Sequence, residues 1–251
     1  MQNITALKEN LDFQIHHVDE TGSTNEDLKL FARKHEVRAP YALVTQRQFA
    51  GKGTRGRKWE AQQGALLFSV IFPWKNVTLD ASLVPLAVGM SICDVLRALR
   101  CSVSLKWPND IWFQHGKSGG ILCEISKDVS NNKVVIVGIG INKNNSDFKT
   151  TNGWPVTGLG DYLNIESDDI INPFVDSLSE LLKSKNDKIV KKWPLYDHFL
   201  GCKLSFKTED NKESIAGVDL GINELGQLIL QVDQKVMTFY SGTILYDDTI
   251  N

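Results

Sequence analysis

The residues of this sequence best suited to chemistry begin with the run GKGTRGRKW at positions 51–59. Three glycines are interleaved with four cations, and no acid occurs between Arg47 and Lys58, although the whole chain has a formal net charge of -2. A local cluster of cations in a chain that is not basic overall predicts one bound anion rather than a generally cationic surface. Glycines let backbone N–H groups approach such an anion closely. On these residues alone, a mobile solvated surface loop remains an alternative interpretation.

Further conspicuous runs surround this basic loop. They are KWPND at 106–110, KSGGILCE at 117–124 and VGIGIN at 137–142, with Ser23, Thr24 and Asn25 upstream of the loop. In this order and at these intervals, the set closely resembles the motifs of the biotin–protein ligases. The resemblance extends over nearly the whole chain, from about 13 to 245. Any one motif would be weak evidence, whereas four in the right order are strong.

The resemblance implies an ATP-dependent, AMP-forming ligase. ATP would adenylate the carboxylate of biotin and release pyrophosphate, and a lysine of a carrier domain would then attack biotinyl-AMP to form an amide. The implied substrates are biotin, ATP with Mg²⁺, and the biotin carboxyl carrier protein or domain of acetyl-CoA carboxylase or a related carboxylase. Both steps need stabilised negative charge on phosphate oxygens and an anhydride shielded from water.

The resemblance also implies an α+β fold. It comprises a central mixed, largely antiparallel sheet with helices packed on it, as in the class II synthetase-like ligase core, and a small C-terminal β-barrel of the Src-homology type. We place the biotin- and ATP-binding catalytic domain at 1–197 and the barrel at 198–251. Some family members carry an N-terminal repressor domain that binds DNA. Only 22 residues precede Ser23, so we expect neither that domain nor a DNA partner; a monomer and a homodimer both remain open.

Lys117 is the main catalytic candidate. By the resemblance, its ammonium group contacts both the biotin carboxylate and the α-phosphate, and so stabilises the charge of the transition state. The alternative is an ordinary lysine at a strand edge beside a turn. Covalent nucleotidyl transferases use the motif KxDG, whereas the run KSGG has no acid, so we expect no lysyl-AMP intermediate. Arg55 and Arg57 are also catalytic candidates, in a loop that can close over the adenylate as a lid.

The remaining candidates are binding residues, assigned by their position in the motifs. Biotin needs an apolar slot with a few polar groups for its ureido ring. The biotin candidates are Ser23, Thr24, Asn25, Gln48 and Gly120; those for the adenylate and its phosphates are Gly51, Lys52, Gly53, Thr54, Trp59 and Lys106; those for the nucleotide are Asn109, Asp110, Asn142 and Trp154. Asp110 is also a weak Mg²⁺ candidate, acting mainly through ATP. The alternatives are a helix-capping box at Ser23–Glu26, a turn at Asn109 and Asp110, and a packing anchor at Trp59, which we prefer there.

One position departs from the family pattern. The family loop usually reads GRGR, whereas this chain has Gly51, Lys52, Gly53 and Thr54. Thr54 replaces a cation that helps to retain the adenylate, and Lys52 lacks the bidentate fork of arginine. A charge-assisted hydrogen bond contributes about 1.5–3 kcal/mol, so we expect weaker retention of the adenylate unless Arg55 compensates.

Composition places the chain among ordinary soluble proteins. It has 251 residues, of which 42% are hydrophobic and 23% charged, enough for one large domain with or without a small module. We expect no signal peptide in 1–10, no apolar stretch of the roughly 18 residues that a membrane span needs, and a cytoplasmic location without a membrane partner. The four cysteines and five histidines show no metal-ligand spacing, so we expect reduced cysteines and structural histidines.

Hydrophobic periodicity and turn signals predict the elements that must position these residues. Helices are expected from Ser23 to about 35, over 83–100 with Pro85 in the first turn, and over 170–185 with Pro173 near the start. Strands are expected over 41–48 and 66–72, which flank the basic loop, and over 103–107, 111–114, 120–126 and 134–142, the last four of which are joined by short turns as antiparallel neighbours. Shorter strands over 203–207, 213–218, 228–232 and 236–240 form the C-terminal barrel.

Two other functions remain alternatives. A lipoate–protein ligase shares the fold and the adenylation chemistry, although the basic loop and the KWPND run favour biotin. A nucleic-acid-binding protein that uses the basic loop is disfavoured, because positive charge is confined to one segment and the net charge is -2.

Overall fold

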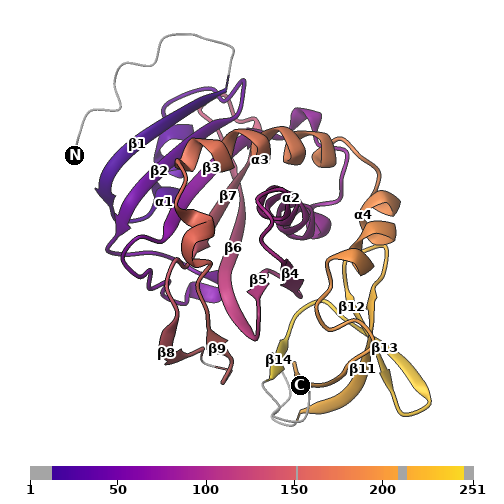
Figure 1. The fold of residues 1–251 in the computed structure, drawn as a ribbon. Coiled ribbons are helices and arrows are strands. Elements are labelled where there is room, and N and C mark those ends of the chain that lie inside the picture. Colours follow the sequence, from indigo (N-terminus) through magenta and orange to yellow (C-terminus); the bar gives the residue numbers. More distant parts are fainter. Residues whose placement is uncertain (1–12, 151, 209–213, 246–251) are drawn as a thin grey trace.

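The computed structural model describes residues 13–150, 152–208 and 214–245 (Figure 1). The expectations for 1–10 and for a strand start at 213 lie outside these residues. The main sheet has nine strands, of which seven follow the order β1-β2-β3-β7-β6-β5-β4. These are β1 (Gln14–Thr21), β2 (Tyr41–Gln48), β3 (Leu66–Pro73), β7 (Lys133–Ile141), β6 (Gly116–Lys127), β5 (Asp110–Phe113) and β4 (Val103–Lys106). The short strand β9 (Pro155–Val156) pairs with β6, and β8 (Ser146–Lys149) pairs with β9.

The main sheet is mixed but largely antiparallel, which confirms the expected architecture. Only the pairs β1–β2 and β6–β9 are parallel among the described strands. Both faces are covered by helices, which are α1 (Thr24–Ala32), α2 (Val84–Ala98) and α3 (Ser167–Leu182). The short helix α4 (Asn186–Lys192) lies beside the C-terminal strands (Figure 1). The short 3₁₀ turns are Thr54–Gly56, Trp74–Asn76, Ala81–Leu83, Gly160–Leu163 and Trp193–Leu195.

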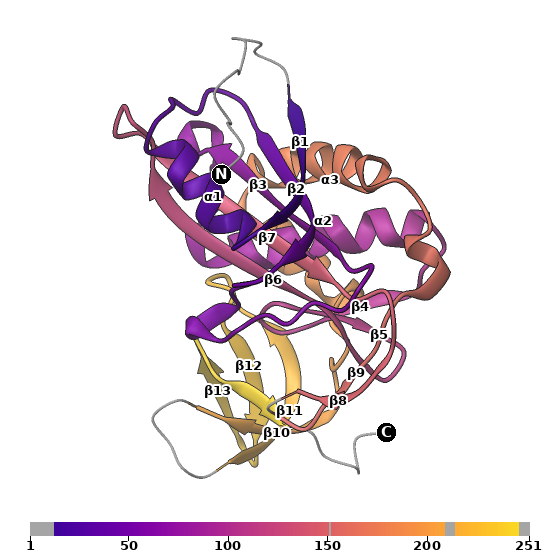
Figure 2. The ribbon, with the colours of Figure 1, turned by 90° about the vertical axis from the view of Figure 1, so that its left-hand side faces the viewer.

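The alternation of side chains along the strands assigns the helices to opposite faces of the sheet. Leu43, Ile71 and Ile136 pack with α1 in one cluster, whereas Val44 and Val70 belong to the larger cluster with α2 and α3. Successive residues of a strand point to opposite faces, so these neighbours must lie on different sides. The two helix layers are visible on either side of the sheet in Figure 2.

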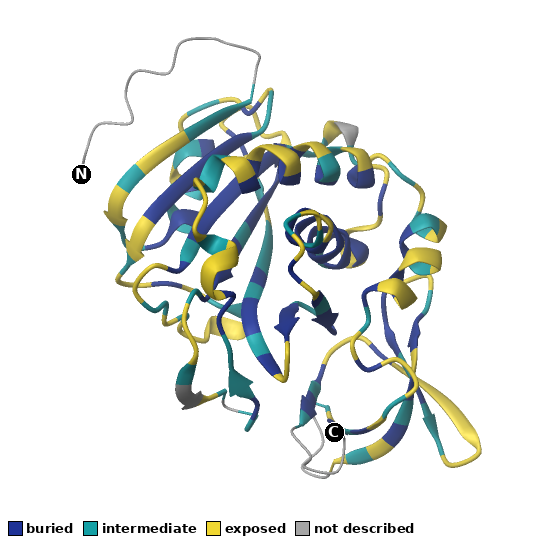
Figure 3. Cartoon of the chain, in the orientation of Figure 1, coloured by how far each residue is buried: buried dark blue, intermediate teal, exposed yellow. Residues whose placement is uncertain are grey.

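Helix α2 corrects one expectation from the sequence. The window Ala81–Ala98 has 18 residues and a mean hydropathy of 1.5, so by length and composition it could cross a membrane. In the structure 67% of this window is buried, and α2 lies between the sheet and α3 (Figure 3). Its apolar character is therefore that of a core helix.

The C-terminal part forms a separate antiparallel sheet of five strands. They are β10 (Lys203–Lys207), β11 (Ile215–Ile222), β12 (Leu228–Val232), β13 (Lys235–Phe239) and β14 (Thr243–Leu245), in the order β13-β12-β11-β10-β14. This confirms a small all-β unit after the main sheet. The pairing order of the described strands is open, and both the Src-homology-type closure and the boundary at 197/198 remain predictions.

The C-terminal sheet is tied to the main sheet by two indole groups. Trp107 Nε1 donates to the carbonyl of Gly226 at 3.0 Å, and Trp154 Nε1 donates to the carbonyl of Ile244 at 2.9 Å. Trp107 follows β4 directly, and Trp154 precedes β9. The C-terminal sheet is therefore anchored beside the strands that carry the KWPND run.

Three local expectations were wrong or incomplete. Ser23 occupies the N-cap position of α1, but its side chain makes no capping hydrogen bond, and Glu26 pairs with Lys29 and Lys52 instead. Helix α3 begins at Ser167, so Pro173 lies within it rather than near its start. Strand β1 and helix α4 were not expected at all.

Candidate functional site

A cavity of about 790 Å³ opens where the basic loop, the strands β6 and β7, the KWPND run and the edge of the C-terminal sheet meet. Every binding and catalytic candidate from the sequence lines this cavity except Gly51. They are Ser23, Thr24, Asn25, Gln48, Lys52, Gly53, Thr54, Arg55, Arg57, Trp59, Lys106, Asn109, Asp110, Lys117, Gly120, Asn142 and Trp154. The fold thus gathers segments from Ser23 to Thr243, about 220 positions apart in the sequence, around one space.

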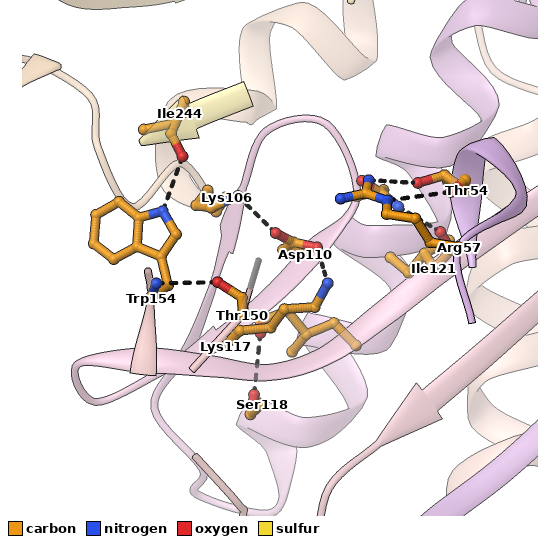
Figure 4. A network of polar contacts seen from close by, with 12 residues as sticks. Thr54, Arg57, Lys106, Asp110, Lys117, Ser118, Ile121, Thr150, Trp154 and Ile244 are labelled. Atoms are coloured by element: carbon orange, nitrogen blue, oxygen red, sulfur yellow. Dashed lines mark hydrogen bonds and ion pairs between the residues drawn. The ribbon is translucent and has the colours of Figure 1, made fainter. Parts of the chain in front are cut away.

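Lys106, Asp110 and Lys117 form the charged centre of the cavity (Figure 4). Lys106 Nζ lies 2.6 Å from Asp110 Oδ2, and Lys117 Nζ lies 2.5 Å from Asp110 Oδ1. The three residues come from the neighbouring strands β4, β5 and β6. Lys117 is inside β6, not in the turn before it, because the strand begins at Gly116. The strand pairing therefore fixes the position of its backbone.

Burial acts on these charges in opposite directions. Burial opposes ionisation of Asp110, but the positive charges of Lys106 and Lys117 outweigh it and hold the pKa of this carboxyl well below its ordinary value. Burial lowers the pKa of the Lys106 ammonium, and Asp110 counteracts this shift only in part. The cluster has two cations and one anion, which leaves positive charge available to an anionic ligand.

Asp110 does not offer a free metal-binding oxygen in this arrangement, because each of its oxygens accepts a hydrogen bond from a lysine. Among the described residues there is also no group of three His, Cys, Asp or Glu side chains that could hold a metal ion. Mg²⁺ commonly binds through substrate phosphates and water rather than through a protein cage. The role of Asp110 toward Mg²⁺ accordingly stays a prediction.

The basic loop is a narrow hairpin-like turn. Lys52 and Lys58 form an isolated antiparallel bridge, Gly53 N–H donates to the Arg57 carbonyl at 2.8 Å, and Trp59 N–H donates to the Gly51 carbonyl at 2.9 Å. A Cβ atom at Gly51 would lie 2.7 Å from the carbonyl oxygen of Trp59, so only glycine fits there. Gly51 thus shapes the base of the loop, which explains why it does not line the cavity.

The cations of this loop already have protein partners. Lys52 Nζ lies 2.9 Å from Glu26 Oε1, and Arg57 donates from Nη2 to Thr54 Oγ1 at 3.1 Å and from Nε to the Thr54 carbonyl at 3.3 Å. Arg55 has a backbone φ of 60°, in the left-handed region that non-glycine residues seldom adopt. An anion in the cavity would compete for these exposed side chains, because the contacts of Lys52 and Arg57 lie near the surface and are weak.

Trp59 packs onto glycines of two adjacent strands. A Cβ atom at Gly140 would lie 2.6 Å from the indole, and one at Gly120 would lie 3.1 Å from it. Gly120 and Gly140 face each other across β6 and β7, so together they make room for the ring. Lys117 Nζ lies 5.6 Å from the indole centroid. Trp59 is therefore a packing anchor that also faces the cavity, with no hydrogen-bond partner recorded for its buried Nε1 within the described chain.

The other end of the cavity is a small polar pocket beneath α1. Thr24 N–H donates to Gln48 Oε1 at 2.8 Å, Thr24 Oγ1 lies 2.6 Å from Ser69 Oγ, and Ser69 Oγ donates to Asn25 Oδ1 at 2.6 Å. Phe68, Leu122 and Ile139 add apolar lining. Polar groups that converge beside apolar walls are the pattern of a small-molecule site.

Ser69 lines this pocket and Glu124 contacts it from behind through Asn25, and neither was identified as a site residue from the sequence. Ser69 is fully buried, and Glu124 Oε2 accepts from Asn25 Nδ2 at 2.9 Å. The only signal for Ser69 was one hydroxyl inside the otherwise apolar strand LLFSVIFP. Glu124 occurs within the KSGGILCE run, but no local pattern there indicates its contact with Asn25.

The nucleotide candidates are held mainly by backbone groups. Asn109 Nδ2 donates to the Ile121 carbonyl at 2.7 Å, and Asn142 Nδ2 donates to the Thr157 carbonyl at 3.4 Å. Trp154 is only 4% exposed and packs edge-on against Trp112, with ring centroids 4.9 Å apart. Since Trp154 is so enclosed, stacking of adenine on its face remains a prediction.

The fold and the site together define a class of protein. A mixed sheet presents a glycine-rich cationic loop, the buried Lys106 and half-buried Lys117, and a polar pocket around one cavity, as adenylate-forming ligation requires. A model of the biotin/lipoate A/B protein ligase family matches residues 18–142. The chain belongs to the biotin protein ligase family.

Individual relatives agree with this assignment. The chain is 28% identical to the bifunctional ligase/repressor BirA of Escherichia coli, over 88% of this chain and 70% of that protein. It is 33% identical to the biotin–[acetyl-CoA-carboxylase] ligase of Mycobacterium tuberculosis, over 51% of this chain and 49% of that protein. The biotin protein ligase of Aquifex aeolicus, solved with biotin and ATP, has a TM-score of 0.74 at 29% identity, covering 92% of this chain and 97% of that one.

Proposed function

We propose that this chain is a biotin–protein ligase that adenylates biotin with ATP and transfers it to a lysine of a carrier domain. The family membership and the solved Aquifex aeolicus relative, which binds biotin and ATP, support the reaction class. The carrier is the biotin-accepting protein or domain of acetyl-CoA carboxylase or a related carboxylase, as the name of the Mycobacterium tuberculosis relative suggests. We place the reaction in the cytoplasm.

The observation that carries this proposal is the arrangement of two glycines along β7. A Cβ atom at Gly138 would lie 2.3 Å from Asn25 Oδ1, and a Cβ atom at Gly140 would lie 2.6 Å from the Trp59 indole. Residues i and i+2 of a strand share one face and lie about 7 Å apart. The polar pocket and the charged centre are therefore neighbours on the same face, as a ligand with a ureido ring at one end and a carboxylate at the other requires.

Lys117 is the residue best placed to act on the reacting groups. Its Nζ faces the cavity beside Gly120, 3.6 Å from where a Cβ atom at that glycine would lie. An ammonium group there attracts both the biotin carboxylate and the α-phosphate, and stabilises the charge that develops as pyrophosphate leaves. Asp110 holds Lys117 in place in the absence of ligand, and Lys106 keeps that carboxylate ionised.

The basic loop is proposed to close over the adenylate. Lys52, Arg55 and Arg57 would then contact phosphate oxygens in place of their present partners, and Trp59 would keep the base of the loop seated on β6 and β7. Such closure shields the mixed anhydride from water until the carrier lysine attacks. Mg²⁺ would enter with the phosphates of ATP.

The decisive test compares biotin with lipoate. The purified chain is incubated with Mg-ATP, a biotin carrier domain and either radiolabelled biotin or radiolabelled lipoate. The proposal expects label on the carrier with biotin and none with lipoate. Label with lipoate alone would replace this function by lipoate–protein ligation. A gel-shift with DNA and RNA at physiological salt, expected to show no complex, tests the nucleic-acid-binding alternative.

A further inference from the structure

A chain of hydrogen bonds lies behind the proposed biotin pocket and ends at Glu124. Glu124 Oε2 accepts from Asn25 Nδ2 at 2.9 Å, Asn25 Oδ1 accepts from Ser69 Oγ at 2.6 Å, and Ser69 Oγ lies 2.6 Å from Thr24 Oγ1. Asn25 and Ser69 are almost completely buried, being 3% and 0% exposed. Their hydrogen atoms therefore have few alternative acceptors.

The carboxylate of Glu124 fixes the orientation of the Asn25 amide. A carboxylate only accepts hydrogen bonds, so the NH₂ group of Asn25 must face Glu124 and its oxygen must face Ser69. Lys29 Nζ lies 2.6 Å from Glu124 Oε1. Burial opposes the charge on Lys29, but its contacts with Glu124 and Glu26 outweigh burial and raise its pKa. Lys29 therefore occupies Oε1 of Glu124, and Oε2 accepts the hydrogen bond from Asn25.

The orientation of Asn25 determines the direction of the remaining bonds. Ser69 has one hydroxyl hydrogen, and it points to Asn25 Oδ1. The contact of 2.6 Å between Ser69 and Thr24 then requires the hydrogen of Thr24. Thr24 has no hydrogen left for Gln48 Oε1, which lies 3.2 Å from Thr24 Oγ1. Both residues line the cavity, and each oxygen can therefore act there as a hydrogen-bond acceptor.

We propose that Glu124 is a positioning residue that sets the direction of the hydrogen bonds in the biotin pocket, so that Thr24 and Gln48 present acceptors to the ureido N–H groups of biotin. Glu124 does this through Asn25 and Ser69 without touching the ligand. The inference rests on the proposed function, because it takes biotin as the ligand. It adds a reason for selectivity, since a ligand without an N–H donor at this point leaves two acceptors unpaired.

The test uses two ligands and measures their dissociation constants by calorimetry. One is biotin, and the other is a biotin analogue methylated on its ureido nitrogens, which has no N–H donors. For wild type we expect biotin to bind at least about tenfold more tightly than the analogue, as loss of a buried hydrogen bond predicts. Glu124→Gln lets the Asn25 amide turn, so the ratio should fall to about threefold or less, mainly through weaker binding of biotin.

Several variants separate positioning from general structural damage. Glu124→Asp retains an acceptor-only group. Its preference for biotin over the methylated analogue should therefore stay closer to that of wild type than the preference of Glu124→Gln does. Ser69→Ala breaks the chain one link further on and should also reduce the ratio, which keeps the proposal testable if Glu124→Gln does not fold. Glu180→Gln removes an exposed carboxylate that pairs with Lys188 at 3.1 Å, far along the sequence from the pocket residues, and should leave the ratio unchanged.

Steady-state kinetics provide a second measurement. Glu124→Gln should raise the KM for biotin by about tenfold and leave kcat within about twofold, because Glu124 acts on binding and not on the reacting atoms. An unchanged affinity ratio in Glu124→Gln and Ser69→Ala, with biotin still bound by wild type, would overturn this inference alone. Failure of wild type to bind biotin would overturn the proposed function as well.

Discussion

At the scale of single residues, the site depends on how Lys117 is held. Its ammonium group shares Asp110 with Lys106, and it lies beside the Trp59 indole at 5.6 Å. A lysine is a compact point charge, whereas the guanidinium of arginine is planar and wider. The space between Asp110, Gly120 and Trp59 therefore suits lysine specifically.

We predict that Lys117→Ala lowers the rate of adenylation by about 100-fold or more, because one charged group is removed from the transition state. Asp110 keeps its ion pair with Lys106, so the melting temperature should change little. Lys117→Arg should not restore activity. The measurement is pyrophosphate release with saturating biotin and ATP. Near-normal release by Lys117→Ala would remove this residue from the mechanism.

Thr54 determines a second prediction at this scale. Its hydroxyl and carbonyl oxygens accept two hydrogen bonds from Arg57, so it holds a cation instead of supplying one. Thr54→Arg should slow dissociation of biotinyl-AMP by about tenfold, equivalent to about 1.4 kcal/mol, and reduce labelling of bystander lysines. The measurement is the adenylate off-rate, together with a blot for biotin on added albumin.

Thr54→Val is the matched control for this prediction. It releases Arg57 from the hydroxyl without adding a charge. If the missing cation is the cause of fast adenylate release, Thr54→Val should retain the adenylate no better than wild type does. Equal off-rates in wild type and Thr54→Arg would show that Arg55 or Lys52 already fills the role.

Some residues of the site could be predicted from the sequence, whereas Ser69 could not. The motifs led to Lys117, Asp110 and the loop cations because each occurs in a distinctive run. Ser69 is a lone hydroxyl in an apolar strand, and its function arises only from its pairing with Gly138 and its contact with Asn25. A contact between residues 44 positions apart leaves no local pattern in one sequence.

At the scale of elements, β6 and β7 form the floor of the site. Gly120 and Gly140 are paired directly, and the absence of side chains there admits the Trp59 ring. Trp59, which packs on these glycines, also closes the base of the basic loop, because its N–H donates to the Gly51 carbonyl. The strands therefore determine where the loop sits.

We predict that Gly140→Ala displaces Trp59 and loosens the basic loop, because the new methyl group would lie 2.6 Å from the indole. Overpacking of this kind costs about 1–3 kcal/mol. Faster tryptic cleavage at Arg55 and Arg57, with slower adenylation, is the expected result. In a double-mutant cycle with Trp59→Leu, the two changes should be non-additive by about 1 kcal/mol. Additive effects would contradict the proposed contact.

Most elements of the main sheet were predictable, and the errors have identifiable causes. The strand over 41–48 was located correctly from its apolar residues and flanking turns, as was α2 from its helical spacing. The capping box at Ser23 failed because Glu26 has two lysine partners, Lys29 and Lys52, that compete with the backbone. One of these partners comes from the loop, 26 positions away, so local sequence could not reveal it.

At the scale of the whole molecule, the junction between the two sheets contains two carboxyl groups, of which Asp219 is fully buried and Asp197 half-buried. Asp197 accepts from Trp193 Nε1 at 2.6 Å, and Asp219 accepts from Gly221 N–H at 2.7 Å. Asp219 Oδ2 has no partner recorded within the described chain. Burial raises the pKa of both groups, and the charge of Asp197 raises that of Asp219 further. The protonated forms are therefore favoured in the folded state.

The sign of the resulting pH dependence follows from linkage. The stabilisation from these protonated carboxyls is complete below their unfolded pKa, near 3.8, and is lost as the pH rises through the higher folded pKa values. Stability should therefore fall between about pH 4 and pH 7, because the folded pKa is about 6 for Asp197 and about 7 for Asp219. We predict that Asp219→Asn raises the free energy of unfolding at pH 8 by about 1–2 kcal/mol and changes it less at pH 5. The exposed residue Asp176, changed to Asn, is the matched control.

Urea unfolding at both pH values measures this effect. A wild-type free energy of unfolding that rises between pH 5 and pH 8, with a rise that is absent in Asp219→Asn, would show the opposite sign. That result would contradict the assignment. Neither carboxyl was identified from the sequence, because their effect depends on two segments that meet only when the C-terminal sheet docks beside β4.

The central claim for the whole molecule is that one cavity joins biotin to AMP. Biotin-dependent exchange of labelled pyrophosphate into ATP measures that step alone, without a carrier protein. The account predicts exchange that requires both biotin and Mg-ATP, is at least about 100-fold weaker in Lys117→Ala, and is accompanied by biotinyl-AMP in the acid-quenched mixture. Exchange that is absent in wild type, or that proceeds equally without biotin, would contradict it.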